Sequence, residues 1–139
     1  MLEAGEIIDK YEIVSPLAAG GIGVVYHARH TLLEQDVALK VLMDNLAISE
    51  KVRHRFRQEA YVQSKLDHPH IVKVTDFIVT PKHLGLVMPL INGPSLHELI
   101  TDAEGPLPLA QVDAIFREVA SAMAYAHQRG IAHRDIKPG

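Results

Sequence analysis

The sequence contains no cysteine and no tryptophan, and aromatic residues make up only 5% of its 139 positions. Without cysteine the chain has no disulfide scaffold, no thiolate zinc site and no cysteine nucleophile. Neither sign of charge is in large excess, because 14 basic and 17 acidic residues leave a formal net charge of −3. A chain with this balance has no overall basic field, so we do not expect it to bind nucleic acid.

Long apolar runs are missing as well. The longest spans residues 84–91 and includes a glycine and a proline, whereas a membrane-spanning helix needs about 20 apolar residues. The first six residues carry two glutamates and no basic residue, which excludes the charge pattern of a secretory signal peptide. We therefore expect a cytoplasmic chain without membrane contact of its own, although a longer parent protein could be anchored through other segments.

Short alternating segments dominate the first part of the chain, where two of them flank a glycine cluster as in a β-hairpin. Over residues 49–66 the apolar positions instead recur at helical spacing, and Ser49 is expected to cap that helix. We predict a mostly antiparallel sheet of five strands with one inserted helix. The predicted strands cover residues 11–18, 24–29, 36–43, 71–79 and 84–88.

The rest of the chain is predicted to be helical. A short helix is expected over residues 94–100 and a long amphipathic helix over residues 109–129, which Gly130 ends. The sequence Asn92-Gly93-Pro94 is typical of a joint between two parts. We therefore predict an α+β fold, with a sheet domain over residues 1–91 and an incomplete helical domain over residues 92–139.

The glycine cluster is the first feature that could carry chemistry, and it reads Ala18-Ala19-Gly20-Gly21-Ile22-Gly23. Glycines allow backbone amides to approach a phosphate closely and to form an anion-binding concavity. A glycine-rich turn between two strands is, however, more often only a hairpin. Taken alone, the cluster favours a plain turn over a phosphate site.

Lys40 stands on a short apolar strand, on the face that it shares with Ala38. A lysine that faces a core must pair with an anion or lose its charge, unless it extends to water at the sheet edge. Glu59 lies on the apolar stripe of the following helix, where a carboxylate also needs a partner. We predict a Lys40–Glu59 ion pair, which either aims the ammonium at a phosphate or serves only as a structural salt bridge.

The segment after the long helix reads His133-Arg134-Asp135-Ile136-Lys137. An aspartate on a loop is a candidate proton acceptor, and a nearby lysine can hold a transferring phosphate. In most proteins an aspartate and a lysine this close simply belong to a solvated loop. The residues alone leave both interpretations open.

These features follow one another in the order glycine-rich turn, strand lysine, helix glutamate and His-Arg-Asp loop, and in that order the chain resembles the protein kinase family. The likeness extends over nearly the whole chain. It is carried by residues 17–25, Val37-Ala38-Leu39-Lys40, Arg57-Gln58-Glu59, residues 66–72, the hinge-like residues 86–96 and His133-Arg134-Asp135-Ile136-Lys137-Pro138. The lysine at position 137 resembles the serine/threonine-directed branch, and residues 55–60 look like those of bacterial members.

The resemblance implies a kinase N-lobe followed by the first helices of the C-lobe, with ATP and Mg²⁺ as cofactors and a protein as substrate. Lys40 would hold the α- and β-phosphates and pair with Glu59, Asp135 would accept the proton of the substrate hydroxyl, and Lys137 would steady the γ-phosphate. The remaining nucleotide contacts would come from Leu17, Ala18, Gly20, Gly21, Gly23, Val25, Ala38, Met88, Pro89 and Ile91. Among these, Val25 and Ala38 would sandwich the adenine and Met88 would stand at the back of its pocket.

Three residues depart from the family pattern. Ala18 replaces the first glycine of the turn, and Pro89 replaces the usual acidic residue of the hinge. Pro89 lacks an N–H but keeps its carbonyl, so we expect the adenine pocket to survive. Gln63 stands where an apolar residue usually packs behind the helix, and we expect it to loosen the active alignment.

The sequence ends at Gly139, before the family's metal-binding asparagine and Asp-Phe-Gly segment. The resemblance therefore places the magnesium ligands beyond residue 139 and none within the chain. Because phosphoryl transfer depends on such ions, we expect this truncated portion to be inactive by itself. The alternative is a non-catalytic nucleotide-binding or scaffolding module. In either case the apolar face of the helix over residues 109–129 has fewer partners, which predicts a homodimer or a segment exchange through this helix.

Overall fold

A computed structural model of the chain describes residues 1–20, 23–43, 49–133 and 136–138. Its contacts divide the chain into two compact units. The first comprises Met1–Lys65 and Val72–Ile91, and the second comprises Leu66–Ile71 and Asn92–Gly139. The units meet in sequence between Ile91 and Asn92, and the short segment Leu66–Ile71 groups with the second unit.

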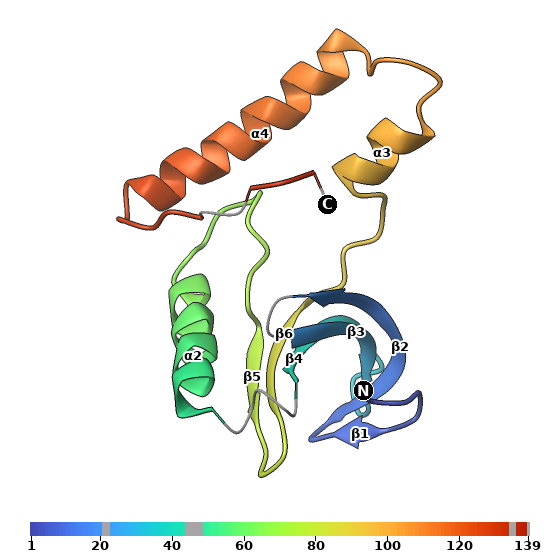
Figure 1. Cartoon of the computed structure of the whole chain (residues 1–139), viewed down its shortest axis with the longest axis vertical. Coiled ribbons are helices and arrows are strands. Elements are labelled where there is room, and N and C mark those ends of the chain that lie inside the picture. Colours follow the sequence, from blue (N-terminus) through green and yellow to red (C-terminus); the bar gives the residue numbers. More distant parts are fainter. Residues whose placement is uncertain (21–22, 44–48, 134–135, 139) are drawn as a thin grey trace. The chain divides into compact units, whose positions relative to one another are not determined.

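The first unit is built on a six-stranded antiparallel sheet in the order β1-β2-β3-β4-β6-β5 (Figure 1). The strands are β1 Ile7–Ile8, β2 Tyr11–Gly20, β3 Gly23–His30, β4 Asp36–Leu42, β5 Asp76–Val79 and β6 Leu84–Pro89. The five predicted strands are present. The predicted count of five is too low by one, because β1 has only two residues and is too short to show alternation.

The fourth predicted strand, residues 71–79, begins too early, since β5 spans only Asp76–Val79. The carbonyl of Val72, within the predicted range, accepts a hydrogen bond from the Gln63 side chain at 3.0 Å. This carbonyl thus has its hydrogen-bond partner outside the sheet ladder. The apolar residues at 71–74 therefore mimic a strand in sequence without forming one.

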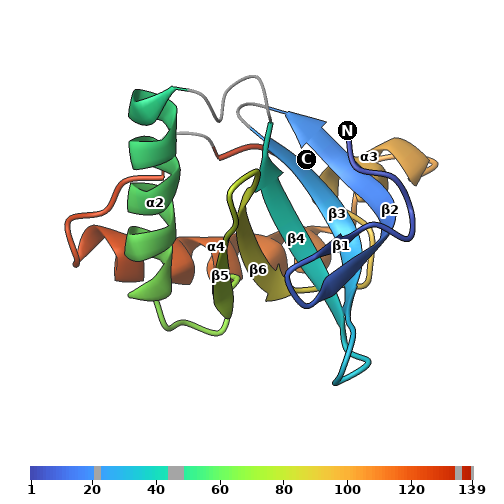
Figure 2. The ribbon, with the colours of Figure 1, turned by 90° about the horizontal axis from the view of Figure 1, so that it is seen from below.

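Alternation along the strands produces two hydrophobic clusters on opposite faces of the sheet. The larger consists of Ile8, Tyr11, Ile13, Val24, Tyr26, Ala28, Leu39, Val41, Ile78 and Val87. The smaller consists of Leu42, Leu84 and Leu86 from the sheet together with Phe56 and Ala60 from the helix α2, Glu50–Ser64. Figure 2 shows α2 beside β5 and β6, which it covers on this second face.

The helix α2 agrees with its predicted span except at its ends. Ser49 is its N-cap residue as predicted, but the Ser49 side chain accepts no capping hydrogen bond. Glu50 in the first turn still suits the positive end of the helix dipole. The position of α2 therefore depends on its buried residues Phe56 and Ala60 rather than on its cap.

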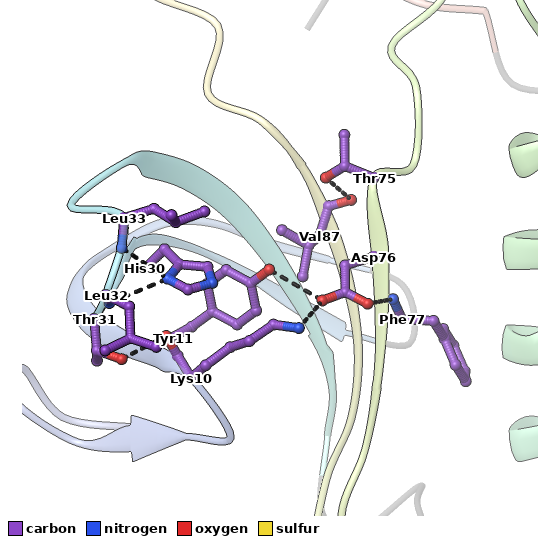
Figure 3. A network of polar contacts seen from close by, with 10 residues as sticks. All are labelled: Lys10, Tyr11, His30, Thr31, Leu32, Leu33, Thr75, Asp76, Phe77 and Val87. Atoms are coloured by element: carbon purple, nitrogen blue, oxygen red, sulfur yellow. Dashed lines mark hydrogen bonds and ion pairs between the residues drawn. The ribbon is translucent and has the colours of Figure 1, made fainter.

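A polar network joins β2 to β5, near the two ends of the sheet (Figure 3). Asp76 Oδ2 accepts hydrogen bonds from Lys10 Nζ at 2.8 Å and from the Tyr11 hydroxyl at 3.1 Å. Asp76 Oδ1 accepts a third, from the backbone N–H of Phe77 at 2.8 Å. The Tyr11 ring packs edge-on against His30. The network thus connects the two ends of the curled sheet.

The pKa values of Asp76, Lys10 and Tyr11 are all shifted in this network. The hydrogen bond from Lys10 is the main cause that lowers the pKa of Asp76 below its ordinary 3.8. The same contact raises the pKa of Lys10 above 10.5. Burial is the main cause that raises the pKa of Tyr11 above 10.0. Each shift favours the state in which Asp76 is ionised, Lys10 is protonated and the Tyr11 hydroxyl is neutral.

The second unit contains α3, Leu96–Asp102, and α4, Leu109–His127. The helix α3 begins two residues after its predicted start at residue 94, because Ser95 is its N-cap. The Ser95 hydroxyl accepts a hydrogen bond from the N–H of Glu98, and the Glu98 carboxylate accepts one from the N–H of Ser95. Gly130, with φ of +72°, follows α4 in the left-handed conformation that suits glycine. Within the described ranges, no helix is both long and apolar enough to cross a membrane.

Three contacts explain why the segment Leu66–Ile71 belongs to the second unit. The N–H of Asp67 donates to the Tyr125 hydroxyl at 3.0 Å, and His68 Nε2 lies 3.1 Å from the Ser121 hydroxyl. His70 Nδ1 lies 3.6 Å from a carboxylate oxygen of Glu118 on α4. This segment follows α2 directly, so α2 is succeeded by residues that pack on α4.

Candidate functional site

The predicted contact between Lys40 and Glu59 is present in the first unit. Lys40 Nζ lies 2.6 Å from Glu59 Oε1, and the two side chains are 23% and 43% exposed. Neither charge is fully removed from water, so the pair avoids the large desolvation cost of a buried ion pair. The contact fixes a cation that still has surface available to an anionic ligand.

Local sequence accounts for this pair. Lys40 lies between the buried residues Leu39 and Val41 on β4, so alternation turns its side chain to the opposite face. Phe56 is fully buried and sets which side of α2 meets the sheet. Glu59 follows three residues later and therefore shares that side.

Three apolar side chains share the sheet face of Lys40. Val25 is its register partner on β3, Ala38 precedes it by two residues on β4, and Met88 is the register partner of Ala38 on β6. All three are partly exposed, whereas Leu86, the partner of Lys40 on β6, is buried in the cluster with α2. The face thus offers an apolar patch next to an immobilised cation.

The glycine-rich turn begins where β2 and β3 pair at Gly20 and Gly23. A Cβ at position 23 would lie 2.7 Å from the carbonyl oxygen of Val41, so close packing requires glycine there. A Cβ at position 20 would meet no atom within 4 Å. Leu17 and Ala18 are exposed residues of β2 just before the turn.

The two hinge residues of the predicted site lie at the end of the first unit. Pro89 is the last residue of β6 and the register partner of Val37, and its side chain is exposed. Ile91 is the last residue of the unit and is 67% exposed. Their contacts with an adenine edge stay predictions.

The other predicted catalytic residues are not all described. Gly21 and Asp135 lie outside the described residues. Lys137 is an exposed residue of the second unit. The carbonyl of the neighbouring Pro138 accepts a hydrogen bond from the N–H of His97 at 2.9 Å, which ties this end of the chain to α3.

Gln63 makes contacts that the sequence does not indicate. Its Nε2 donates to the carbonyl of Val72 at 3.0 Å and to the sulfur of Met88 at 3.8 Å. The sequence marks Gln63 only as a polar residue in an apolar position. Nothing in the spacing points to Met88, which lies on a strand separated from α2 by a loop and by β5.

Comparison with known proteins identifies the family and the fold. The sequence matches the protein kinase domain family over residues 11–139, and the chain belongs to that family. The predicted kinase-like N-lobe fold is likewise confirmed, by likeness to solved kinase domains.

Particular relatives are bacterial. The chain is 35% identical over 129 residues to serine/threonine-protein kinase pkn2 from Myxococcus xanthus, covering 93% of this chain and 15% of that protein. It is 39% identical over 138 residues to serine/threonine-protein kinase PrkC from Bacillus subtilis, covering 99% of this chain and 21% of that protein. The crystal structure of the Mycobacterium tuberculosis PknI kinase domain is similar with a TM-score of 0.81 and 35% identity, over 99% of this chain and 55% of that one. The chain therefore spans about half of a solved kinase domain.

Proposed function

We propose that the first unit binds Mg-ATP as the nucleotide-binding portion of a protein kinase that phosphorylates serine or threonine hydroxyls. The observation that carries the proposal is the 2.6 Å contact between Lys40 and Glu59 on a partly exposed sheet face. A carboxylate that holds a lysine restricts where its ammonium can lie, and phosphoryl transfer depends mainly on such positioning.

The phosphates would lie between Lys40 and the glycine-rich turn. Lys40 would contact the α- and β-phosphates, and backbone N–H groups around Gly20, Gly21 and Gly23 would contact phosphate oxygens. The close approach of Gly23 to Val41 supports this, because it keeps the start of β3 close to the strand that carries Lys40. Leu17 and Ala18 would cover the nucleotide from β2.

The adenine would lie on the apolar patch beside Lys40. Val25 and Ala38 would contact its faces, and Met88 would limit the pocket at the back. The carbonyl of Pro89 and the N–H of Ile91 would bond to its polar edge. The partial exposure of Val25, Ala38 and Met88 supports this assignment, because a flat apolar ligand would bury the remainder of their surface.

The transfer step would use residues of the second unit. Asp135 would accept the proton of the protein hydroxyl as that oxygen attacks the γ-phosphorus, and Lys137 would stabilise the charge on the γ-phosphate. Mg²⁺ would arrive as part of the Mg-ATP substrate. The likeness to two bacterial serine/threonine-protein kinases supports serine or threonine as the acceptor.

Calorimetric titration of Mg-ATP into the 139-residue chain tests the proposal. We expect saturable binding to the wild type, a loss of at least about tenfold in Lys40→Met, and unchanged binding in Lys51→Met. Lys51 is an exposed lysine of α2 and serves as the matched control. Equal weakening in both variants, or no binding to the wild type, would contradict the proposal.

We further propose that residues 1–139 alone transfer phosphate negligibly, since they include none of the magnesium ligands that the family resemblance implies. Incubation with labelled ATP and a generic protein acceptor measures this. Transfer that disappears in an Asp135→Ala variant would overturn it.

Self-association through α4 and a cytoplasmic location complete the proposal. Phe116 and Leu109 on α4 are 65% and 82% exposed, which supports pairing of this helix with a second copy. The absence of cysteine is consistent with a reducing compartment.

A further inference from the structure

Gln63 lies on α2 one helical turn after Glu59, so the two side chains share the side of the helix that meets the sheet. Glu59 accepts a hydrogen bond from Lys40 on β4, and Gln63 donates one to Met88 on β6. The helix is therefore joined by neighbouring polar contacts to two adjacent strands. The first contact belongs to the site already described, and the second has no assigned purpose.

The orientation of the Gln63 amide is fixed by its partners. The carbonyl oxygen of Val72 and the thioether sulfur of Met88 can only accept hydrogen bonds, so the NH₂ end of the amide must face both. The side chains of Gln63 and Met88 are partly buried. Methionine has three rotatable side-chain bonds, and a donor held against its sulfur restricts a group that would otherwise change rotamer easily.

We propose that Gln63 is a positioning residue that holds the Met88 side chain at the back of the nucleotide site and so limits the size of the base that the site accepts. The inference rests on the proposed function, because only that proposal places a base beside Met88. Met88 is the register partner of Ala38, and the place of its side chain decides how far the apolar patch extends toward α2.

A spectroscopic experiment on the unliganded chain tests the contact itself. The chain contains four methionines, so labelling of their ε-methyl carbons gives four signals, and Met88→Leu assigns one of them. We expect the Met88 signal to move in both Gln63→Leu and Gln63→Glu, which remove the donor at nearly constant side-chain size. The matched controls are Gln58→Leu and Gln58→Glu, at an exposed glutamine of the same helix, and these should leave all four signals in place.

A binding experiment on the same variants tests the consequence for specificity. The two ligands are ATP and an ATP analogue that carries a benzyl group on the exocyclic amine of adenine. Release of Met88 should improve binding of the analogue relative to ATP by roughly five- to tenfold in the Gln63 variants. The ratio should not change in the Gln58 variants.

The outcomes separate this inference from the proposed function. An unmoved Met88 signal in both Gln63 variants, or an unchanged or decreased binding ratio, would overturn the positioning role. If the wild type binds no nucleotide while the Met88 signal responds, the contact stands but the nucleotide function, and with it the role in specificity, falls. A moved signal together with a raised ratio supports the inference.

Discussion

At the scale of single residues, the contact between Glu59 and Lys40 can be tested by removing one charge. Glu59→Gln keeps the size of the side chain and an acceptor oxygen but removes the charge that attracts Lys40. We expect Mg-ATP affinity to fall by about 3- to 10-fold, because a partly exposed ion pair contributes modestly to the position of its partners. Calorimetry measures the change, and Glu50→Gln at the exposed start of α2 is the control. Wild-type affinity in Glu59→Gln would exclude an orienting role for the pair.

Asp76 gives the first unit a predictable response to acid. Its folded-state pKa lies below the ordinary 3.8, mainly because Lys10 donates to it. The unfolded chain therefore binds more protons between the two pKa values, and folding stability rises with pH there. This stabilisation is complete above the unfolded pKa and is lost as the pH falls through the folded one.

Replacing Asp76 with asparagine should remove that response. We expect the free energy of unfolding of Asp76→Asn to fall less steeply than that of the wild type between about pH 5 and pH 3. Urea unfolding at a series of pH values measures the slope. Asp102→Asn, at the exposed end of α3, should retain the wild-type slope. An unchanged slope in Asp76→Asn would show that the network does not set acid stability.

At the scale of elements, the two described glycines of the turn between β2 and β3 should respond differently to the same substitution. Gly23→Ala would place a Cβ 2.7 Å from the Val41 carbonyl oxygen, whereas Gly20→Ala would meet nothing within 4 Å. A backbone oxygen cannot move aside cheaply, so we expect Gly23→Ala to destabilise the fold by about 1–3 kcal/mol. Chemical denaturation of both variants measures the difference, and equal stabilities would contradict the close approach.

Elements whose cause is local could be predicted from the sequence. Alternation gives β2, β3, β4 and β6, helical spacing gives α2 and α4, and Gly130 marks the end of the last. The lysine–glutamate contact could also be predicted, because two charges on apolar faces each require a partner.

What escaped prediction depends on contacts between distant segments. The two-residue strand β1 exists only because β2 lies beside it, and Ile71, Val72 and Val74 are apolar but belong to no strand. In the sequence Asp76 looks like an ordinary strand residue. Its contacts with Lys10 and Tyr11 arise only when the sheet has folded. The hydrogen bond from the Gln63 amide to the Met88 sulfur likewise depends on tertiary packing. Such packing produces no periodic pattern in the sequence.

At the scale of the whole molecule, the apolar surface of α4 should determine the oligomeric state. Only Ala122 and Ala126 of this helix are buried, while Phe116 is 65% exposed. We expect concentration-dependent self-association of the chain and at least about tenfold weaker association in Phe116→Asp. Sedimentation equilibrium measures both, with Gln111→Asp on the exposed surface of the same helix as control. A monomeric mass throughout the micromolar range would refute the pairing.

The strand order also determines when this sheet can form during synthesis. β5 precedes β6 in the chain, yet β6 is its pairing partner and lies between it and β4. A growing chain that has released β5 but not β6 has nothing to pair it with, and the contact between Tyr11 and Asp76, 65 residues apart, cannot yet be held. The addition of residues 84–89 therefore extends the sheet and closes it in one step. Pairing between distant segments loses the entropy of closing the loop before it gains contacts. The nascent first unit should therefore stay exposed to chaperones and proteases until β6 has emerged.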